Sequence, residues 1–191
     1  NEIKKSVELL NNINPNIDLK FRNECLDKAD LIEFLCFHYT SQRIKAKNLG
    51  NQILEKAINN KNEQQEMLVL IHLAQANQID AQWSLSKKQF ERALLLFDET
   101  RDANLANEYG IHVKAQGLAM SSFSYFYLGN PNKALLRIQK AIAYSEEITH
   151  DSSVAFSYLY IGLYGYFIGD YNLVKNELSK YKQYHNKSRE N

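Results

Sequence analysis

Residues 128–135 read LGNPNKAL and join two amphipathic helical segments through a tight turn. Pro131 suits the first turn of a helix, where its missing N–H is not needed. Forty residues after Gly129, the pair Gly169-Asp170 again follows an apolar residue and precedes a helical pattern. This recurrence of an apolar-Gly-polar joint predicts that the chain repeats a helical hairpin.

The second helix of each predicted hairpin carries a trio of residues at i, i+4 and i+7, which share one helix face. The trios recur at a nearly constant offset and are Ala93, Phe97 and Thr100; Ala134, Ile138 and Ala141; Val174, Leu178 and Tyr181. Tetratricopeptide repeats have this pattern at a usual length of about 34 residues, whereas HEAT-type repeats match the length better. The glycine turns and the small residues Ser122 and Gly162 favour the tetratricopeptide-like interpretation. We predict an all-α fold, a right-handed superhelix of antiparallel helical hairpins with a repeat of about 40 residues.

The periodicity predicts a single helical-repeat domain over residues 1–191, with hairpins at about 18–60, 63–100, 111–149 and 151–185. In the second hairpin we expect a long helix over 63–84 and its partner over 89–100. The linker 101–110 is polar with room for a short helix, and the polar tail is expected to fray from His185.

At the N-terminus, Ile3, Val7 and Leu10 form a helical stripe that Pro15 stops, which predicts the second helix of a truncated hairpin. Asn1 stands where an initiator Met is expected, so we interpret the chain as a fragment of a longer multidomain protein.

Composition agrees with long helices, because 45% of residues are hydrophobic and the 191 residues include only two Pro and seven Gly. The 23 basic and 22 acidic side chains nearly cancel without clustering, which predicts no nucleic-acid partner and no polybasic membrane patch. No apolar run approaches the roughly 18 residues of a membrane helix, so we expect no membrane insertion and a cytoplasmic location. Cys25 and Cys36 are interpreted as reduced core thiols.

Residues 109–112 (YGIH), 127–135 (YLGNPNKAL), Ala141 and 150–156 (HDSSVAF) resemble the C-terminal helical-repeat region of large bacterial multidomain signalling proteins. In those proteins an AAA-type or STAND-type ATPase is joined to nucleotidyl-cyclase, kinase or LuxR-type DNA-binding modules. The resemblance covers about three quarters of the chain and rests on packing positions. Family members often have Pro directly after the position of His150, whereas Asp151 follows here. The resemblance implies a regulatory repeat region and carries over no catalytic residue.

Nothing in the sequence favours catalysis. There is no Gly-x4-Gly-Lys-Ser/Thr motif for a nucleotide phosphate. The hydroxyls of residues 121–124 lack the base and oxyanion donor that a serine nucleophile needs. The five histidines are His38, His72, His112, His150 and His185. No two of them stand at the i, i+4 spacing that lets helical imidazoles share a metal. We therefore predict no cofactor, no metal and no enzyme activity.

The first helix of each hairpin is expected to line the concave surface, where glutamines beside aromatic residues could hold a peptide. The candidate partner-binding residues are Gln75, Gln78, Gln82, Gln116, Phe123, Tyr127 and Tyr166. We predict a protein-interaction or regulatory scaffold, the sensor or adaptor repeat region of a bacterial multidomain regulator, with a partner protein, a peptide or another domain of the same chain as its ligand. The alternatives are a solvated face that binds nothing, a helical hydrolase or transferase fragment, and a purely structural spacer.

Overall fold

The computed structural model describes residues 19–40 and 42–190, with the backbone alone for residues 19–25. Over these residues every regular element is an α-helix, which confirms the all-α class. The predicted helix over 3–10 lies outside the described residues. In chain order the helices are α2 (Leu19–Tyr39), α3 (Arg43–Asn59), α4 (Glu63–Ile79), α5 (Trp83–Leu96), α6 (Glu99–Asp102), α7 (Leu105–Tyr109), α8 (Val113–Tyr127), α9 (Pro131–Glu147), α10 (Asp151–Ile168) and α11 (Tyr171–Glu190).

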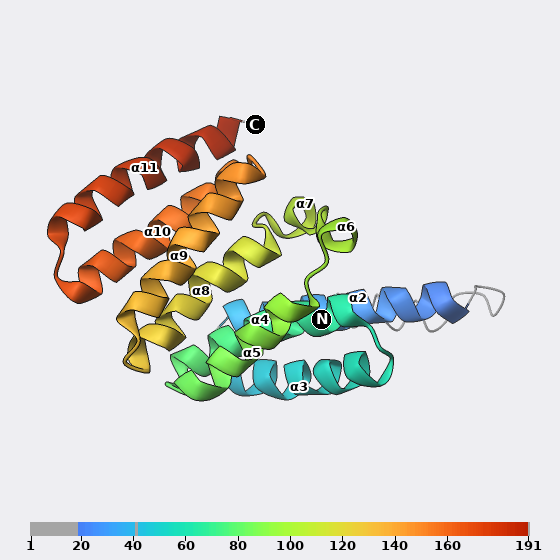
Figure 1. Ribbon diagram of the computed structural model, residues 1–191. Coiled ribbons are helices and arrows are strands. Elements are labelled where there is room, and N and C mark those ends of the chain that lie inside the picture. The colour runs from blue at the N-terminus through green and yellow to red at the C-terminus, as the bar shows by residue number, and fades with distance from the viewer. Residues whose placement is uncertain (1–18, 41, 191) are drawn as a thin grey trace.

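The long helices follow one another as the pairs α2–α3, α4–α5, α8–α9 and α10–α11, stacked from the blue end to the red end of the chain (Figure 1). Each long helix packs against the next one along the chain. In addition, α2 touches α4, α4 touches α8, and α8 touches α10. The first helices of the pairs therefore form an inner row, and the second helices lie outside it.

Five turns between the long helices repeat one backbone geometry. Each places one residue in the left-handed region, with φ between 52° and 78°: Lys61, Ala81, Gly129, Thr149 and Gly169. In the third of these turns, the N–H of Gly129 donates to the carbonyl of Phe126 at 3.0 Å, and the N–H of Asn130 donates to that of Tyr125 at 2.9 Å. This pair of bonds is the Schellman motif, and the other four turns have it too.

The left-handed turn residues are evenly spaced on either side of one interruption. Lys61 and Ala81 are separated by the same interval as Gly129 and Thr149, and as Thr149 and Gly169. One helix with its turn therefore spans a constant unit of twenty residues, and a helix pair spans two such units. The interval from Ala81 to Gly129 exceeds one pair by eight positions. We call this excess the insertion, and the segment between α5 and α8 in which it falls contains the short helices α6 and α7.

The predicted boundaries in the second hairpin are wrong. α4 ends at Ile79 rather than near residue 84, and α5 begins at Trp83 rather than at 89. The reason is that Ala81 adopts the left-handed conformation of a helix-ending residue with φ 57°. Alanine is the strongest helix former, so the sequence does not mark this turn.

The insertion also shifts the register of the trios. The fourth residues of the second helices are Ala46, Ser86, Ala134 and Val174. By this position Ser86 is the structural counterpart of Ala134, in place of the predicted Ala93, and both Ser86 and Ala134 are fully buried. The trio that begins at Ala134 is fully buried as predicted, whereas Thr100 of the first trio is exposed in α6.

Two smaller predictions are also wrong. α11 continues to Glu190 instead of fraying from His185. It is held there by Lys187, whose Nζ lies 2.9 Å from Asp151 Oδ1. Cys36, predicted to be a core thiol, is a free and exposed cysteine.

Candidate functional site

A cluster of aromatic rings spans α5, α8 and α10. We call it the aromatic face, and it consists of Trp83, Phe123, Phe126, Tyr127, Phe156, Tyr160, Tyr166 and Phe167. The rings of Trp83 and Tyr127 are stacked, with centroids 4.1 Å apart and an interplanar angle of 15°. The Tyr127 ring meets the edge of Phe167 at 6.0 Å, and Phe167 meets Tyr166 at 5.8 Å. The face therefore joins three consecutive helix pairs.

An inner layer of rings supports the outer ones. The Phe123 ring lies 5.1 Å from Tyr160 and 5.6 Å from Phe167, and Phe156 lies 4.8 Å from Tyr160. Tyr160 is buried and Phe123 and Phe156 are half-buried. The outer rings remain accessible, because Tyr127 is 46% exposed, Phe167 43% and Tyr166 61%. Ring stacking of this kind holds the outer side chains in fixed positions.

The stretches of α8 and α10 that carry most of the face are free of charge. Neither residues 115–132 nor residues 152–169 contain an Asp, Glu, Lys or Arg. Burial raises the pKa of the Tyr160 hydroxyl, and the nearby hydroxyl of Tyr39 raises it further, so this phenol stays neutral. A charged group placed against these rings would lose water without gaining a counter-ion on either stretch. The face is therefore suited to bind uncharged chemical groups.

The predicted glutamine stripe does not form one surface. Gln78 is buried, and its Nε2 donates to the carbonyl of Met120 at 2.8 Å and to the hydroxyl of Ser124 at 2.9 Å. Gln82 lies beyond α4, as the N-cap residue of α5. The prediction that both project from an exposed first-helix surface is wrong, because α4 ends at Ile79 and because Gln78 faces α8.

Gln75 is half-buried and belongs to a histidine cluster. Its Oε1 accepts a hydrogen bond from His38 Nε2 at 2.9 Å. The rings of His38 and His72 have centroids 5.6 Å apart. Burial lowers the pKa of His72 to about 3 and also lowers the pKa of His38, so both imidazoles are neutral near pH 7. Gln75 thus orders this neutral pair.

The remaining predicted partner-binding residues lie in two separate parts of the structure. Phe123, Tyr127 and Tyr166 all belong to the aromatic face, connected through Phe167. Gln116 is half-buried near the start of α8. It lies eleven residues before Tyr127, or about 16 Å along the helix axis, so it is separate from the rings around Tyr127.

Sequence reasoning missed Trp83 and Phe167 as site residues, although they link the rings of the face. The predicted helix over 63–84 contains Trp83, whereas Trp83 is the first residue of α5. The turns carry the signal for Phe167, because the residue two positions before the left-handed turn residue recurs as Ile79, Tyr127 and Phe167. Their exposed fractions are 57%, 46% and 43%. The repeat therefore places an exposed apolar residue at this position in each of three pairs.

Among the described residues, no group of three or more His, Cys, Asp or Glu side chains is placed to hold a metal ion. Over the same part of the chain, no helix is both long enough and apolar enough to cross a membrane. In comparisons with known proteins, no protein-family model and no curated protein matches this chain.

Proposed function

We propose that this chain is a protein-interaction scaffold, a right-handed superhelix of tetratricopeptide-like hairpins, whose aromatic face binds an uncharged segment of a partner protein. The observation that carries the proposal is the continuous line of exposed rings from Tyr127 through Phe167 to Tyr166, on helix stretches without charge. Contiguous exposed apolar patches on soluble proteins commonly mark binding sites.

The arrangement of the helices supports the superhelical part of the proposal. Helix pairs that pack mainly on their neighbours, with first helices in an inner row, are the plan of helical repeat proteins. The interval between left-handed turn residues, which is the same on either side of the insertion, supports a true repeat. A pair of this length exceeds the usual tetratricopeptide length of about 34 residues, and each helix is accordingly longer.

The charge-free stretches of α8 and α10 support the choice of partner. Aromatic anchors bind through buried area and ring contacts, and affinity concentrates in a few such residues. We infer that the bound segment carries aromatic or aliphatic side chains and no charge where it meets Tyr127 and Phe167. Its source is a separate protein or another domain of the same polypeptide.

We also propose that the chain acts as the sensor or adaptor repeat region of a bacterial ATPase-linked regulator. The support is the residue pattern over 109–112, 127–135 and 150–156. The complete open reading frame tests this context directly. A phosphate-binding Gly-x4-Gly-Lys-Ser/Thr motif encoded upstream would support it, and a frame that encodes only helical hairpins would contradict it.

Selection from a displayed peptide library tests the binding proposal. We expect the chain to enrich uncharged peptides with aromatic or aliphatic residues. The double substitution Tyr127→Ala and Tyr166→Ala should weaken binding of the enriched peptides by about tenfold to a thousandfold, because truncating an aromatic interface anchor commonly costs about 1 to 4 kcal/mol.

The matched control is the double substitution Leu95→Ala and Leu136→Ala, which removes exposed apolar side chains, 80% and 50% accessible, from the outer row. This variant should bind the peptides as the parent does. Enrichment of charged peptides, or equal affinity of the Tyr127→Ala/Tyr166→Ala variant, would exclude the aromatic face as the site. If no peptide is enriched, the spacer alternative is favoured.

A further inference from the structure

A cluster of charged side chains surrounds the ring of Tyr125, where α8 meets the outer helices α5 and α9. Both outer helices begin at the lower left of Figure 1. Lys87 Nζ of α5 lies over the ring, 5.3 Å from its centroid, and Arg137 Cζ of α9 lies 5.2 Å from the same centroid. Tyr125 is only 9% exposed, so its ring is a fixed platform for both cations. The sequence does not reveal this cluster, because its members are far apart in the chain.

One carboxylate, that of Glu91, belongs to the cluster. Tyr125 donates its hydroxyl hydrogen to Glu91 Oε1, and Arg137 Nη2 donates to the Tyr125 hydroxyl at 3.3 Å. Arg137 Nη2 lies 3.9 Å from Glu91 Oε1, which is too long for a direct hydrogen bond. Among the described residues, the guanidinium donates no other hydrogen bond and Lys87 forms no ion pair. Arg137 Nε and Nη1 and the Lys87 ammonium therefore keep donors for a ligand.

The charge of the cluster is unbalanced toward positive. Lys133 and Lys140 stand one turn before and one turn after Arg137, so these three cations share one face of α9. Both lysines are exposed. Together with Lys87, the four cations against the single carboxylate of Glu91 give a formal excess of +3. The cluster should therefore attract anions.

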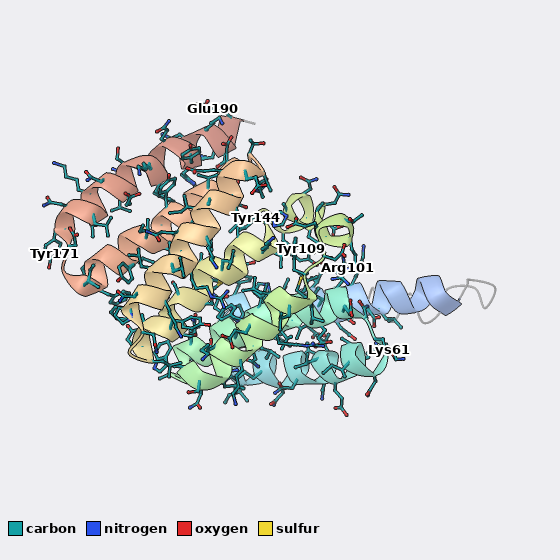
Figure 2. All side chains as sticks on the ribbon, in the orientation of Figure 1. Lys61, Arg101, Tyr109, Tyr144, Tyr171 and Glu190 are labelled. Atoms are coloured by element: carbon teal, nitrogen blue, oxygen red, sulfur yellow. The ribbon has the colours of Figure 1, made fainter. Side chains whose placement is uncertain are left out.

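The basic stretch of α9 is short. It covers residues 133–140, or about 10 Å along the helix axis. The next residue on the same face is Tyr144, which Figure 2 labels, and its hydroxyl donates to Glu99 Oε2 at 3.0 Å, where the carboxylate ends the stretch. Nucleic-acid binding usually neutralises several phosphates along a basic track and stacks bases on accessible rings. The length of this stretch suits a single phosphate, and the Tyr125 ring at its centre is buried.

The cluster is not part of the repeat. Forty positions after Tyr125, the equivalent residue of α10 is Gly165, and forty positions after Arg137, the equivalent residue of α11 is Glu177. Packing within a helix pair therefore does not require this combination of a ring and cations.

We propose that the cluster binds a phosphoryl dianion, supplied by a phosphorylated serine or threonine of a partner protein. The phosphoryl oxygens accept hydrogen bonds from the Arg137 guanidinium and the Lys87 ammonium. A phosphate monoester has a charge of about −1.5 to −2 at pH 7 and three strong acceptor oxygens, which match the excess of charge and donors better than a carboxylate does. Glu91 repels the dianion and so limits its affinity. The site lies on the outer row of helices and is independent of the aromatic face.

Three peptides test the proposal on the whole chain: acetyl-Gly-Gly-Xaa-Gly-Gly-amide with phosphoserine, glutamate or serine at the centre, titrated at neutral pH and physiological salt while amide NMR shifts are followed. We expect the phosphoserine peptide to give saturable shifts centred on Lys87 and Arg137. The glutamate peptide should bind at least about tenfold more weakly, and the serine peptide should give no saturable shift. Equal binding of the glutamate peptide, or no saturable shift with the phosphoserine peptide, would overturn the proposal.

Two further probes distinguish the sources of a phosphoryl group. Inorganic phosphate should shift the same amides as the phosphoserine peptide and compete with it, and shifts confined to other residues would overturn the proposal. A short oligothymidylate should bind more weakly than the phosphoserine peptide, because the basic stretch accommodates one phosphate and offers no accessible ring for a base. Tighter binding of the oligothymidylate would overturn the proposal in favour of a nucleic-acid partner.

Four substitutions locate the bound phosphoryl group. Arg137→Gln should weaken binding of the phosphoserine peptide about tenfold or more. Lys87→Gln should weaken it severalfold, which keeps the test decisive if the Arg137 variant fails to fold. Lys175→Gln is the matched control and should bind as the parent does, because Lys175 is the fifth residue of α11 as Lys87 is of α5.

Glu91→Gln gives the sharpest result, because it keeps an acceptor for the Tyr125 hydroxyl but removes the negative charge. This variant should bind the phosphoserine peptide severalfold more tightly than the parent does. A cluster that only packs α5 against α9 would gain no affinity from this change. Unchanged affinity in Lys87→Gln, together with unchanged or weaker affinity in Glu91→Gln, would overturn the proposal.

Discussion

Gln78 Nε2 lies 2.9 Å from Ser124 Oγ and donates a hydrogen bond to it from α4 to α8. The same nitrogen donates to the carbonyl of Met120 at 2.8 Å, and Ser124 Oγ lies 3.0 Å from Ser86 Oγ on α5. This buried chain of polar groups crosses the boundary at which the insertion interrupts the repeat. It links the second helix pair to the third across this interruption.

Gln78→Ala should lower the free energy of unfolding by about 2 to 3 kcal/mol, because it leaves a small void and removes a buried donor from Met120 and Ser124. Urea denaturation measures the change. Gln82→Ala is the matched control, because Gln82 is exposed and makes no capping bond, and it should stay within about 0.5 kcal/mol of the parent. Equal effects of the two substitutions would contradict the buried role of Gln78.

The fold class could be predicted because it depends on two features that are visible in the sequence. One is the periodicity of the apolar residues, and the other is the glycine at the left-handed positions 129 and 169. The boundaries in the second pair could not be predicted, since Ala81 occupies the same left-handed position without being glycine. That missed turn hid the eight-residue insertion and produced the wrong counterpart, Ala93, for Ala134.

The site could be predicted in part for a related reason. Phe123, Tyr127 and Tyr166 stand out in the sequence as aromatic residues on first helices, and the structure brings them together through Phe167. The glutamines stand out by spacing alone, and spacing does not tell whether an amide faces solvent or a neighbouring helix. Gln78 faces α8, so its polarity serves packing between pairs.

The left-handed turns allow a matched pair of substitutions. Ala81→Gly should raise the free energy of unfolding by roughly 0.5 to 1 kcal/mol, because glycine removes the clash of a Cβ at φ 57°. Gly129→Ala should lower it by about 1 kcal/mol. A Cβ at Gly129 would meet no atom within 4 Å, so that variant reports backbone strain alone. Thermal melting of both variants measures the changes, and shifts of the same sign would contradict the common turn geometry.

The register of the second helices can be tested at α9. Ala134→Arg places a charge and a long side chain at a fully buried position, and should destabilise the chain by several kcal/mol. Leu136→Arg, two residues later and 50% exposed, should change stability by no more than about 0.5 kcal/mol. Circular dichroism melting distinguishes them. A midpoint for Ala134→Arg close to that of the parent would mean that this face of α9 does not pack inward.

His72 should make the stability of the chain depend on pH. It is 5% exposed, and burial, followed by the nearby His38, lowers its pKa from an ordinary 6.5 to about 3. Its surroundings are the rings of Phe34, His38 and Tyr39, with the amide of Gln75. The unfolded chain therefore binds a proton at this imidazole between about pH 6.5 and pH 3, whereas the folded chain does not. The stability that the neutral ring contributes is complete above pH 6.5 and is lost as the pH falls.

The expected size of this effect follows from the same shift. Each pH unit below the ordinary pKa of histidine lowers the free energy of unfolding by about 1.4 kcal/mol. Protonation linked to His72 should therefore lower it by about 2 kcal/mol when the pH falls from 7 to 5. His38, whose pKa burial also lowers, adds a change of the same sign. His72→Phe keeps an aromatic ring against Phe34 but cannot be protonated. Urea denaturation of the parent and of His72→Phe at both pH values should show that the variant loses about 2 kcal/mol less than the parent on acidification. If the two proteins lose the same stability, His72 is not the group that titrates.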